Sequence, residues 1–239
     1  MRVIGGGLAG PVWTVGPAEV ASGPDDASTG ELEAMVESLG RMASAPVGSD
    51  VSDAVRVDRI AVLERLQAAA FAAQAVELAR FADSQEAGQR RAGVPARRVG
   101  VGVAEQVALA CRVSPVTGAR RMGLARALVG QLPSTYALLA RGEISAWVAT
   151  IVAHETDALT AQDRAVVDEQ LAGALAALSP RQAEAAARRA AIGVDPGSAL
   201  RRGRTARSDR RVSIRPAPDT MALLTGFVPV EQGVAAWAA

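Results

Sequence analysis

A helical pattern of nearly forty residues, from about Asp53 to Ala92, constrains the fold of this chain more than any other feature. An unbroken α-helix of that length spans about 60 Å. Helices in water gain most of their stability from packing, so this one needs partners along its length, within the chain or in a second subunit. Its apolar residues at intervals of three and four are Ile60, Leu63, Leu66, Ala70, Ala73 and Phe81.

The residues that follow carry several signals for the start of a helix. Ser114, Ser145, Thr160 and Ser179 each precede an apolar helical pattern, and their hydroxyls suit the N-cap position. Ser179 and Gln182 also match the spacing of a capping box. We therefore predict an all-helical region. The expected helices cover residues 31–42, 53–92, 103–112, 115–131, 160–178 and 180–193, with a pair of short helices in 133–157. In the helix at 160–178 we expect Val166, Val167 and Leu171 to face inward.

The short pair in residues 133–157 invites a comparison with a DNA-binding helix-turn-helix. Gly142 suits the left-handed residue just past a helix end, and it separates the two helices. A recognition helix presents polar and basic side chains to the major groove. The second helix instead carries Thr150, His154, Glu155 and Asp157 and has no arginine. We therefore interpret this pair as part of the core, with Trp147, Val148, Ile151 and Val152 forming a wide apolar stripe.

After Pro196 the pattern changes from helix to strand. Residues 211–215 read RVSIR, and Val212 and Ile214 fall on one face of the expected strand. Residues 216–219 predict a turn and residues 221–228 a return strand, while the last ten residues begin an apolar helix. The predicted fold is mainly α, a multi-helix bundle with one long helix, followed by a small β-hairpin and an incomplete C-terminal helix. We expect a flexible tail (1–30), a helical domain (31–195) and an arginine-rich linker with the hairpin and truncated helix (196–239).

Composition excludes several classes of site. The 239 residues include one histidine, His154, and one cysteine, Cys111. Zinc sites draw two to four Cys or His ligands from one chain, so neither a metal site nor a catalytic residue is expected, and Cys111 excludes an internal disulfide. No apolar run reaches eighteen residues, which argues against a membrane span. We expect a cytoplasmic protein without a cofactor.

The start of the chain contains a pattern that resembles a dinucleotide fingerprint. Gly5, Gly7 and Gly10 match G-x-G-x-x-G. That motif requires a strand before the glycines and a helix after them, so that the helix N-terminus faces the pyrophosphate. Only four residues precede the glycines, and Pro11 and Pro17 interrupt the expected helix. We therefore set aside an oxidoreductase that would use this segment.

The candidate functional residues are arginines near the C-terminus. The whole chain has a formal net charge of +1, yet residues 181–239 carry ten arginines and five acids. The densest run is Arg201, Arg202, Arg204, Arg207, Arg210 and Arg211. On a continuous helix Arg204, Arg207 and Arg211 would share one face, which suits contact with nucleic-acid phosphates. The alternative is a solvated linker, because charge runs often form solvent-exposed faces.

The sequence as a whole resembles a known family. The segments that show this resemblance are RVGVGVAEQVALACRVSP, LARALVGQLPSTYALLARGEISAWVATIVAHET and RRVSIRPAPDTMALLTGFVPVEQGV. They are similar to the actinobacterial thirteen-E-twelve repeat family, the domain of unknown function two-two-two, over about Asp53 to the C-terminus. The resemblance implies a helical domain that precedes an HNH endonuclease module, often in mobile elements.

The metal-binding histidines and supporting asparagine of that module have no counterpart in this chain, which has one histidine and no asparagine. We therefore expect a non-enzymatic helical domain, truncated before the nuclease module, with DNA as the candidate partner. The alternative is a self-association module in which the long helix dimerises without binding nucleic acid.

Overall fold

The computed structural model describes residues 25–44 and 51–238 of the chain. They fall into two compact units, one that contains helix α1 (Asp25–Ala43) and one that begins at Asp53. The predicted helix at 31–42 thus begins earlier than expected. The glycine run at Gly5–Gly10 lies outside the described residues, as does most of the expected tail at 1–30.

The second unit is built on helix α2 (Asp53–Arg91), which confirms the predicted long helix. Its buried face differs from the one expected. Ile60 is 65% exposed, and Ala70 and Ala73 are exposed as well. The buried residues are Ala68, Ala72, Ala75, Ala79 and Ala82. Methyl side chains let a neighbouring backbone approach closely, so the small residues of α2 face the core and the larger ones flank them or lie outside it.

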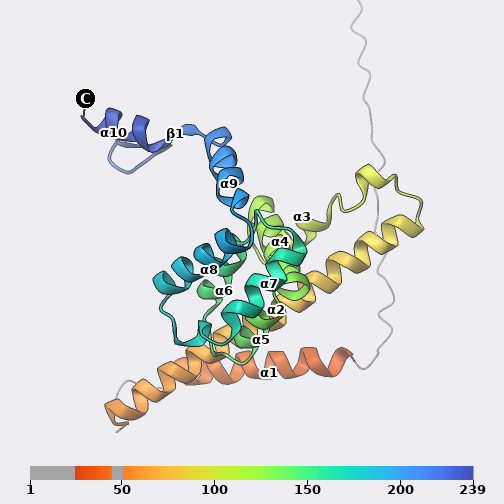
Figure 1. The fold of residues 1–239 in the computed structure, drawn as a ribbon. Helices are drawn as coiled ribbons and strands as arrows, with labels where there is room; N and C mark the ends of the chain where they lie inside the picture. Colours follow the sequence, from red (N-terminus) through yellow and green to blue (C-terminus); the bar gives the residue numbers. More distant parts are fainter. Residues whose placement is uncertain (1–24, 45–50, 239) are drawn as a thin grey trace, which may run out of the picture. The chain divides into compact units, whose positions relative to one another are not determined.

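Shorter helices pack against α2 and against one another. α2 contacts α4 and α5, α3 packs on α4, and α8 lies against both α6 and α7. Figure 1 shows α4 to α8, in green to blue, gathered beside α2. The helices are α3 (Val103–Ala110), α4 (Pro115–Gln131), α5 (Pro133–Ala140), α6 (Ala146–Glu155), α7 (Ala161–Ala172), α8 (Pro180–Val194) and α9 (Gly197–Ser208), with short 3-10 turns η1 (Ala96–Arg98) and η2 (Leu175–Ala177).

The predicted caps are present. The hydroxyl oxygens of Ser114, Ser145 and Thr160 accept backbone N–H groups from the residues three positions on, at 3.2, 3.3 and 3.1 Å. Ser179 and Gln182 form the expected capping box. Gly142 has a φ of 69°, as predicted for the turn between α5 and α6. These bonds fix where each helix begins.

Two expectations about the apolar faces are wrong. Trp147 was expected in the apolar stripe of α6, yet it is 64% exposed, whereas Val148 and Val152 are buried. Val166 was expected to face inward on α7, yet it is 41% exposed beside the fully buried Val167. Neighbouring residues lie about 100° apart around a helix axis. A predicted apolar stripe that is wider than the buried face therefore includes residues that face solvent.

The helix expected at 160–178 is also shorter than predicted. α7 ends at Ala172, Gly173 occupies its C-cap, and η2 follows. Glycine lowers helix stability relative to alanine by roughly 1 kcal/mol, which favours a break at this position. The chain then reaches Ser179, which is the N-cap of α8.

The predicted β-hairpin is present after α9. Strands β1 (Arg211–Pro216) and β2 (Ala222–Phe227) pair antiparallel, with Arg211 opposite Phe227 and Ile214 opposite Leu224. Helix α10 (Val230–Ala238) follows the hairpin. The fold class predicted from the sequence, mainly α with a hairpin and a short helix at the C-terminal end, is confirmed.

No single helix among the described residues is both long and apolar enough to cross a membrane. A pair of segments, Ala96–Ala110 and Pro115–Gln131, reaches that length and apolarity together, but the chain bends by 103° between them.

Candidate functional site

The arginine run predicted as a nucleic-acid contact lies on α9 and at the start of β1. Arg204, Arg207, Arg210 and Arg211 are all exposed. The side chain of Arg202 lies outside the described residues. Because α9 ends at Ser208, Arg211 does not share a helical face with Arg204 and Arg207, contrary to the sequence-based expectation. It begins strand β1 instead, because the ladder with β2 starts at the Arg211–Phe227 pair.

Arg201 differs from the other arginines of the run because it binds residues that precede α9 in the chain. Its Nη2 atom donates to the carbonyl oxygen of Ala158 at 3.1 Å and forms an ion pair with Asp195. The hydrogen bond from Arg201 lowers the pKa of Asp195, and the backbone N–H of Gly197 adds to this effect. Arg201 therefore ties the start of α9 to the turn after α6.

The hairpin adds a second group of polar and basic side chains. Side chains alternate along a strand, so Arg211, Ser213 and Arg215 project from one face of β1, the same face as Phe227 and Thr225 of β2. The guanidinium of Arg211 lies over the Phe227 ring at 5.2 Å from its centroid. This stacking holds a cation on the hairpin surface. One guanidinium nitrogen, Nη1, donates to the carbonyl oxygen of Asp209 at 3.3 Å.

Arg207 lies close to this hairpin face. It lines a shallow depression of about 240 Å³ together with Phe227 and Glu231, and it forms an exposed ion pair with Glu231 at 3.7 Å. We call Arg204, Arg207, Arg210, Arg211 and Arg215 the arginine surface. Sequence analysis missed Arg215 as a member, although the alternation in RVSIR places it on the face of Arg211.

An open cleft of about 620 Å³ lies between the C-terminal end of α6, α9 and β2. Its polar lining combines His154 and Asp157 with Thr205 and Asp209, and Phe227 supplies an apolar wall. Among the described residues, no three His, Cys, Asp or Glu side chains are grouped so that they could hold a metal ion. The cleft thus brings the one histidine near α9, in a setting of mixed charge.

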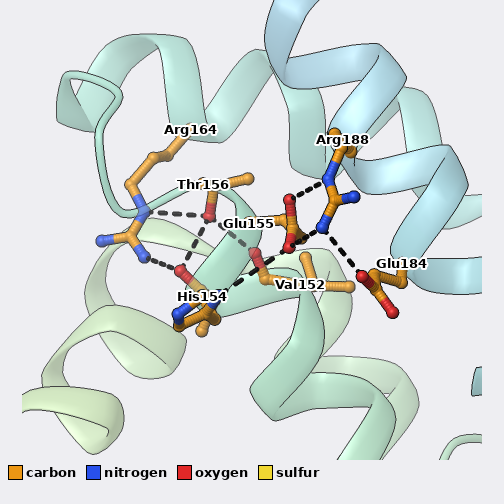
Figure 2. Close-up of polar contacts among 8 residues, drawn as sticks. Val152, His154, Glu155, Thr156, Arg164, Glu184 and Arg188 are labelled. Atoms are coloured by element: carbon orange, nitrogen blue, oxygen red, sulfur yellow. Dashed lines mark hydrogen bonds and ion pairs between the residues drawn. The ribbon is translucent and has the colours of Figure 1, made fainter. Parts of the chain in front are cut away.

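Behind the cleft, a charged network fixes the end of α6. Glu155 is 7% exposed and accepts two hydrogen bonds from the forked guanidinium of Arg188 on α8, at 3.0 and 2.9 Å. Arg188 also donates to Glu184 at 2.8 Å, and both carboxylates raise its pKa. His154 is largely exposed, with its Nδ1 3.8 Å from Glu155 (Figure 2). Sequence patterns did not reveal the Glu155–Arg188 pair.

A second arginine holds the other side of the same turn. Arg164 on α7 is buried, and it donates to the carbonyl oxygen of Ala153 at 2.7 Å and to Thr156 Oγ1 at 3.2 Å (Figure 2). It also donates to Gln131 Oε1 at 2.6 Å. Burial lowers the pKa of Arg164. These bonds satisfy acceptors at the α6 C-terminus, where helix carbonyls lack intrahelical partners. The two arginines therefore join the C-terminal end of α6, which carries His154, to α7 and α8.

Comparison with known proteins identifies a family for residues 60–237 of the chain. No curated protein and no solved structure matches the chain. A family described as "Domain of unknown function (DUF222)" matches residues 60–237, which include α3 to α9, both strands, most of α2 and nearly all of α10. This confirms the domain family predicted from the sequence segments. The chain belongs to the DUF222 family.

Proposed function

We propose that this chain is a non-catalytic, DNA-associated helical domain of an HNH-endonuclease-like protein. The observation that carries the DNA association is the arginine surface, in which α9 and one face of the hairpin each present exposed guanidinium groups. Arginine forms forked hydrogen bonds to phosphate oxygens, and such contacts bind DNA without regard to sequence. The association with an HNH module rests on the family resemblance of the sequence segments.

The neighbouring side chains support a polyanion partner at this surface. Ser213 and Thr225 lie on the same hairpin face as Arg211 and Arg215, and hydroxyl groups also bind phosphate oxygens. Two acids near α9 are partly compensated, because Asp195 is paired with Arg201 and Glu231 with Arg207. A third acid, Asp209, occupies the C-cap of α9 between Arg207 and Arg210. Release of the Glu231 pair would free Arg207 for a phosphate at little cost, since exposed ion pairs contribute about 0–1 kcal/mol.

The experiment is a titration of the purified chain with duplex DNA at several salt concentrations. Four to six phosphate contacts imply a slope of log affinity against log salt on the order of −4 to −5. The triple variant Arg204→Ala, Arg207→Ala, Arg211→Ala should weaken binding similarly on every sequence and flatten the slope by about three units.

A matched control changes the same net charge elsewhere. Arg59, Arg80 and Arg91 are exposed on α2, and their triple replacement by alanine should leave both affinity and slope close to those of the original chain. If both triple variants weaken binding equally, DNA binding depends only on the net charge of the chain and not on the arginine surface. If no binding is detected even at low salt, the proposal of DNA association is wrong.

The non-catalytic part of the proposal has its own test. Purified chain should not cleave DNA in magnesium, manganese or zinc, because the chain offers one histidine and no asparagine for a nuclease centre of the HNH kind. Metal-dependent cleavage that follows the protein peak through successive purification steps would contradict it.

A second candidate function is self-association through the first turns of α2. Val57, Ile60 and Val62 are 63%, 65% and 59% exposed there, whereas the contacts with the core begin near Ala68. A dimer formed by this segment would dissociate when Val57 and Ile60 are changed to glutamate. This second function also predicts that the original chain binds DNA negligibly. Sedimentation of that variant beside the arginine variants separates the two functions.

A further inference from the structure

The two faces of the hairpin differ sharply in chemistry. One face carries the arginines and hydroxyl groups already described. The opposite face, set by the same register, contains no charged or hydrogen-bonding side chain: Val212, Ile214 and Pro216 of β1 and Ala222, Leu224 and Gly226 of β2. We call these six residues the apolar face. Val212, Ile214 and Leu224 are 66%, 71% and 70% exposed, so no described part of the chain covers this face.

Helix α10 presents a second apolar surface of matching kind. Val230, Val234 and Trp237 follow one another at intervals of four and three, so they form one stripe along the helix. They are 78%, 62% and 93% exposed. A two-stranded hairpin is marginally stable in water and normally gains its stability when a helix or a further sheet covers its apolar face. The chain thus contains an apolar sheet face and an apolar helix stripe that suit packing against each other, and both surfaces are exposed.

The start of α10 explains why the helix does not cover its own hairpin. Val230 and Glu231 line the depression that also contains Phe227 and Arg207, and Phe227 belongs to the basic face of the hairpin. The Arg207–Glu231 ion pair is formed on that side as well. The helix therefore begins on the side opposite the apolar face.

We propose that the chain dimerises by reciprocal exchange, with the α10 stripe of each copy lying across the apolar face of the other. Each copy supplies one sheet face and one helix stripe, so the two contacts are identical and close the dimer. The exposed area of these side chains is on the order of 800 Å² per copy, close to what each partner buries in a stable complex. The arginine surface stays on the outside, so the dimer does not depend on DNA binding.

The test uses two adjacent leucines that lie on opposite faces of the hairpin. Leu224 belongs to the apolar face, whereas Leu223 pairs with Arg215 on the basic face, and the two are 70% and 59% exposed. Sedimentation equilibrium of the full chain should show a monomer–dimer equilibrium. Leu224→Arg should weaken it at least thirtyfold, on the order expected for a charge at an interface centre. Leu223→Arg should change it less than about threefold.

A mixing experiment tests the reciprocal arrangement itself. Leu224→Arg and Trp237→Glu should each be monomeric alone, because each disrupts both contacts of a homodimer. Mixed together they should form a heterodimer, in which one contact joins Arg to Glu and the other keeps Leu224 against Trp237. Both residues are so exposed that neither substitution should alter the circular dichroism spectrum or melting of the helical body.

Four results would overturn the proposal. A chain that is monomeric at every concentration would leave the apolar face to a partner of another kind. Growth of ever larger species with concentration would replace the closed dimer with open-ended aggregation through the strand edges. An equal effect of Leu223→Arg and Leu224→Arg, or a dimer lost only on substitution of Val57 and Ile60, would place the interface elsewhere.

Discussion

Asp168 on α7 accepts two hydrogen bonds from Thr135 of α5, from the backbone N–H at 2.9 Å and from the hydroxyl at 2.5 Å. It also accepts the backbone N–H of Ser134 at 2.6 Å. Asp168 is 1% exposed, so α7 caps the N-terminus of a helix that lies earlier in the chain. A carboxylate at this end of a helix also interacts favourably with the helix dipole.

Loss of the charge at Asp168 should therefore destabilise the fold. In Asp168→Asn one oxygen becomes an amide donor that faces the N–H groups of α5, and we expect the free energy of unfolding to fall by about 2–3 kcal/mol. Urea denaturation followed by circular dichroism measures this. The neighbouring Glu169 is exposed, and Glu169→Gln should stay within about 0.5 kcal/mol. Equal effects of the two substitutions would show that the cap contributes little.

The second prediction concerns Arg188, whose guanidinium binds the buried carboxylate of Glu155. Arg188→Ala leaves that carboxylate with much less compensation, so we expect a loss of about 2 kcal/mol, less than for a fully buried pair because Arg188 is 51% exposed. The matched control is Arg189→Ala, on the exposed side of the same helix. Replacement of Glu155 by Gln in the Arg188→Ala background should recover part of the loss, and no recovery would argue against a charge effect.

The pair Glu86 and Arg126, which joins α2 to α4, gives a prediction about pH. The hydrogen bond from Arg126 lowers the pKa of Glu86, and Arg90 adds to this effect at 3.0 Å. The folded state thus favours the carboxylate. This stabilisation is fully present above the pKa that Glu86 has in the unfolded chain, and it is lost as pH falls through the lower pKa of the folded state.

Stability measurements at several pH values check this. Glu86→Gln should lower the free energy of unfolding by about 1 kcal/mol or less at neutral pH, and the difference from the original chain should shrink toward zero in acid. Glu64→Gln, at an exposed position on the same helix, is the control. A difference that is constant across the pH range would mean that the loss comes from packing instead of the ion pair.

The helix starts could be predicted from local sequence signals, whereas the contacts between helices could not. Ser114, Ser145, Thr160 and Ser179 bond to residues three positions away, so each cap is visible in a short segment of sequence. The partners Asp168–Thr135 and Glu155–Arg188 are each separated by 33 residues, and no periodicity relates them. The face of α2 that is buried depends in the same way on the helices packed against it.

The arginine run illustrates the same limit at the candidate site. Its composition was evident, but no local pattern indicated that Arg201 would bind Asp195 and the carbonyl oxygen of Ala158. The end of α9 at Ser208 placed Arg211 on a strand, which separated it from the helical face that its spacing suggested. The alternation of side chains along residues 211–215 would have identified Arg215 as a further member of the arginine surface.

The close contact between α3 and α4 depends on a glycine, and a second glycine on the same helix provides its control. A Cβ atom on Gly118 would lie 2.6 Å from the backbone oxygen of Ala104 and 2.9 Å from the Cβ of Ala108, whereas one on Gly123 would meet nothing within 4 Å. Both glycines are within α4, so the gain in helix propensity on replacement by alanine is the same for each, up to about 1 kcal/mol. The two substitutions differ only in what the new methyl group meets.

Gly123→Ala should therefore raise the free energy of unfolding by about 0.5–1 kcal/mol. Gly118→Ala should lower it by about 1–3 kcal/mol, because the methyl group must push α3 away through contacts with backbone that cannot rotate aside. Thermal and urea unfolding of the two variants measure the opposite signs directly. If Gly118→Ala stabilised the chain as Gly123→Ala does, α3 would have to move away from α4 without loss, and the packing of Val103 and Val107, which are buried, would contribute little to the fold.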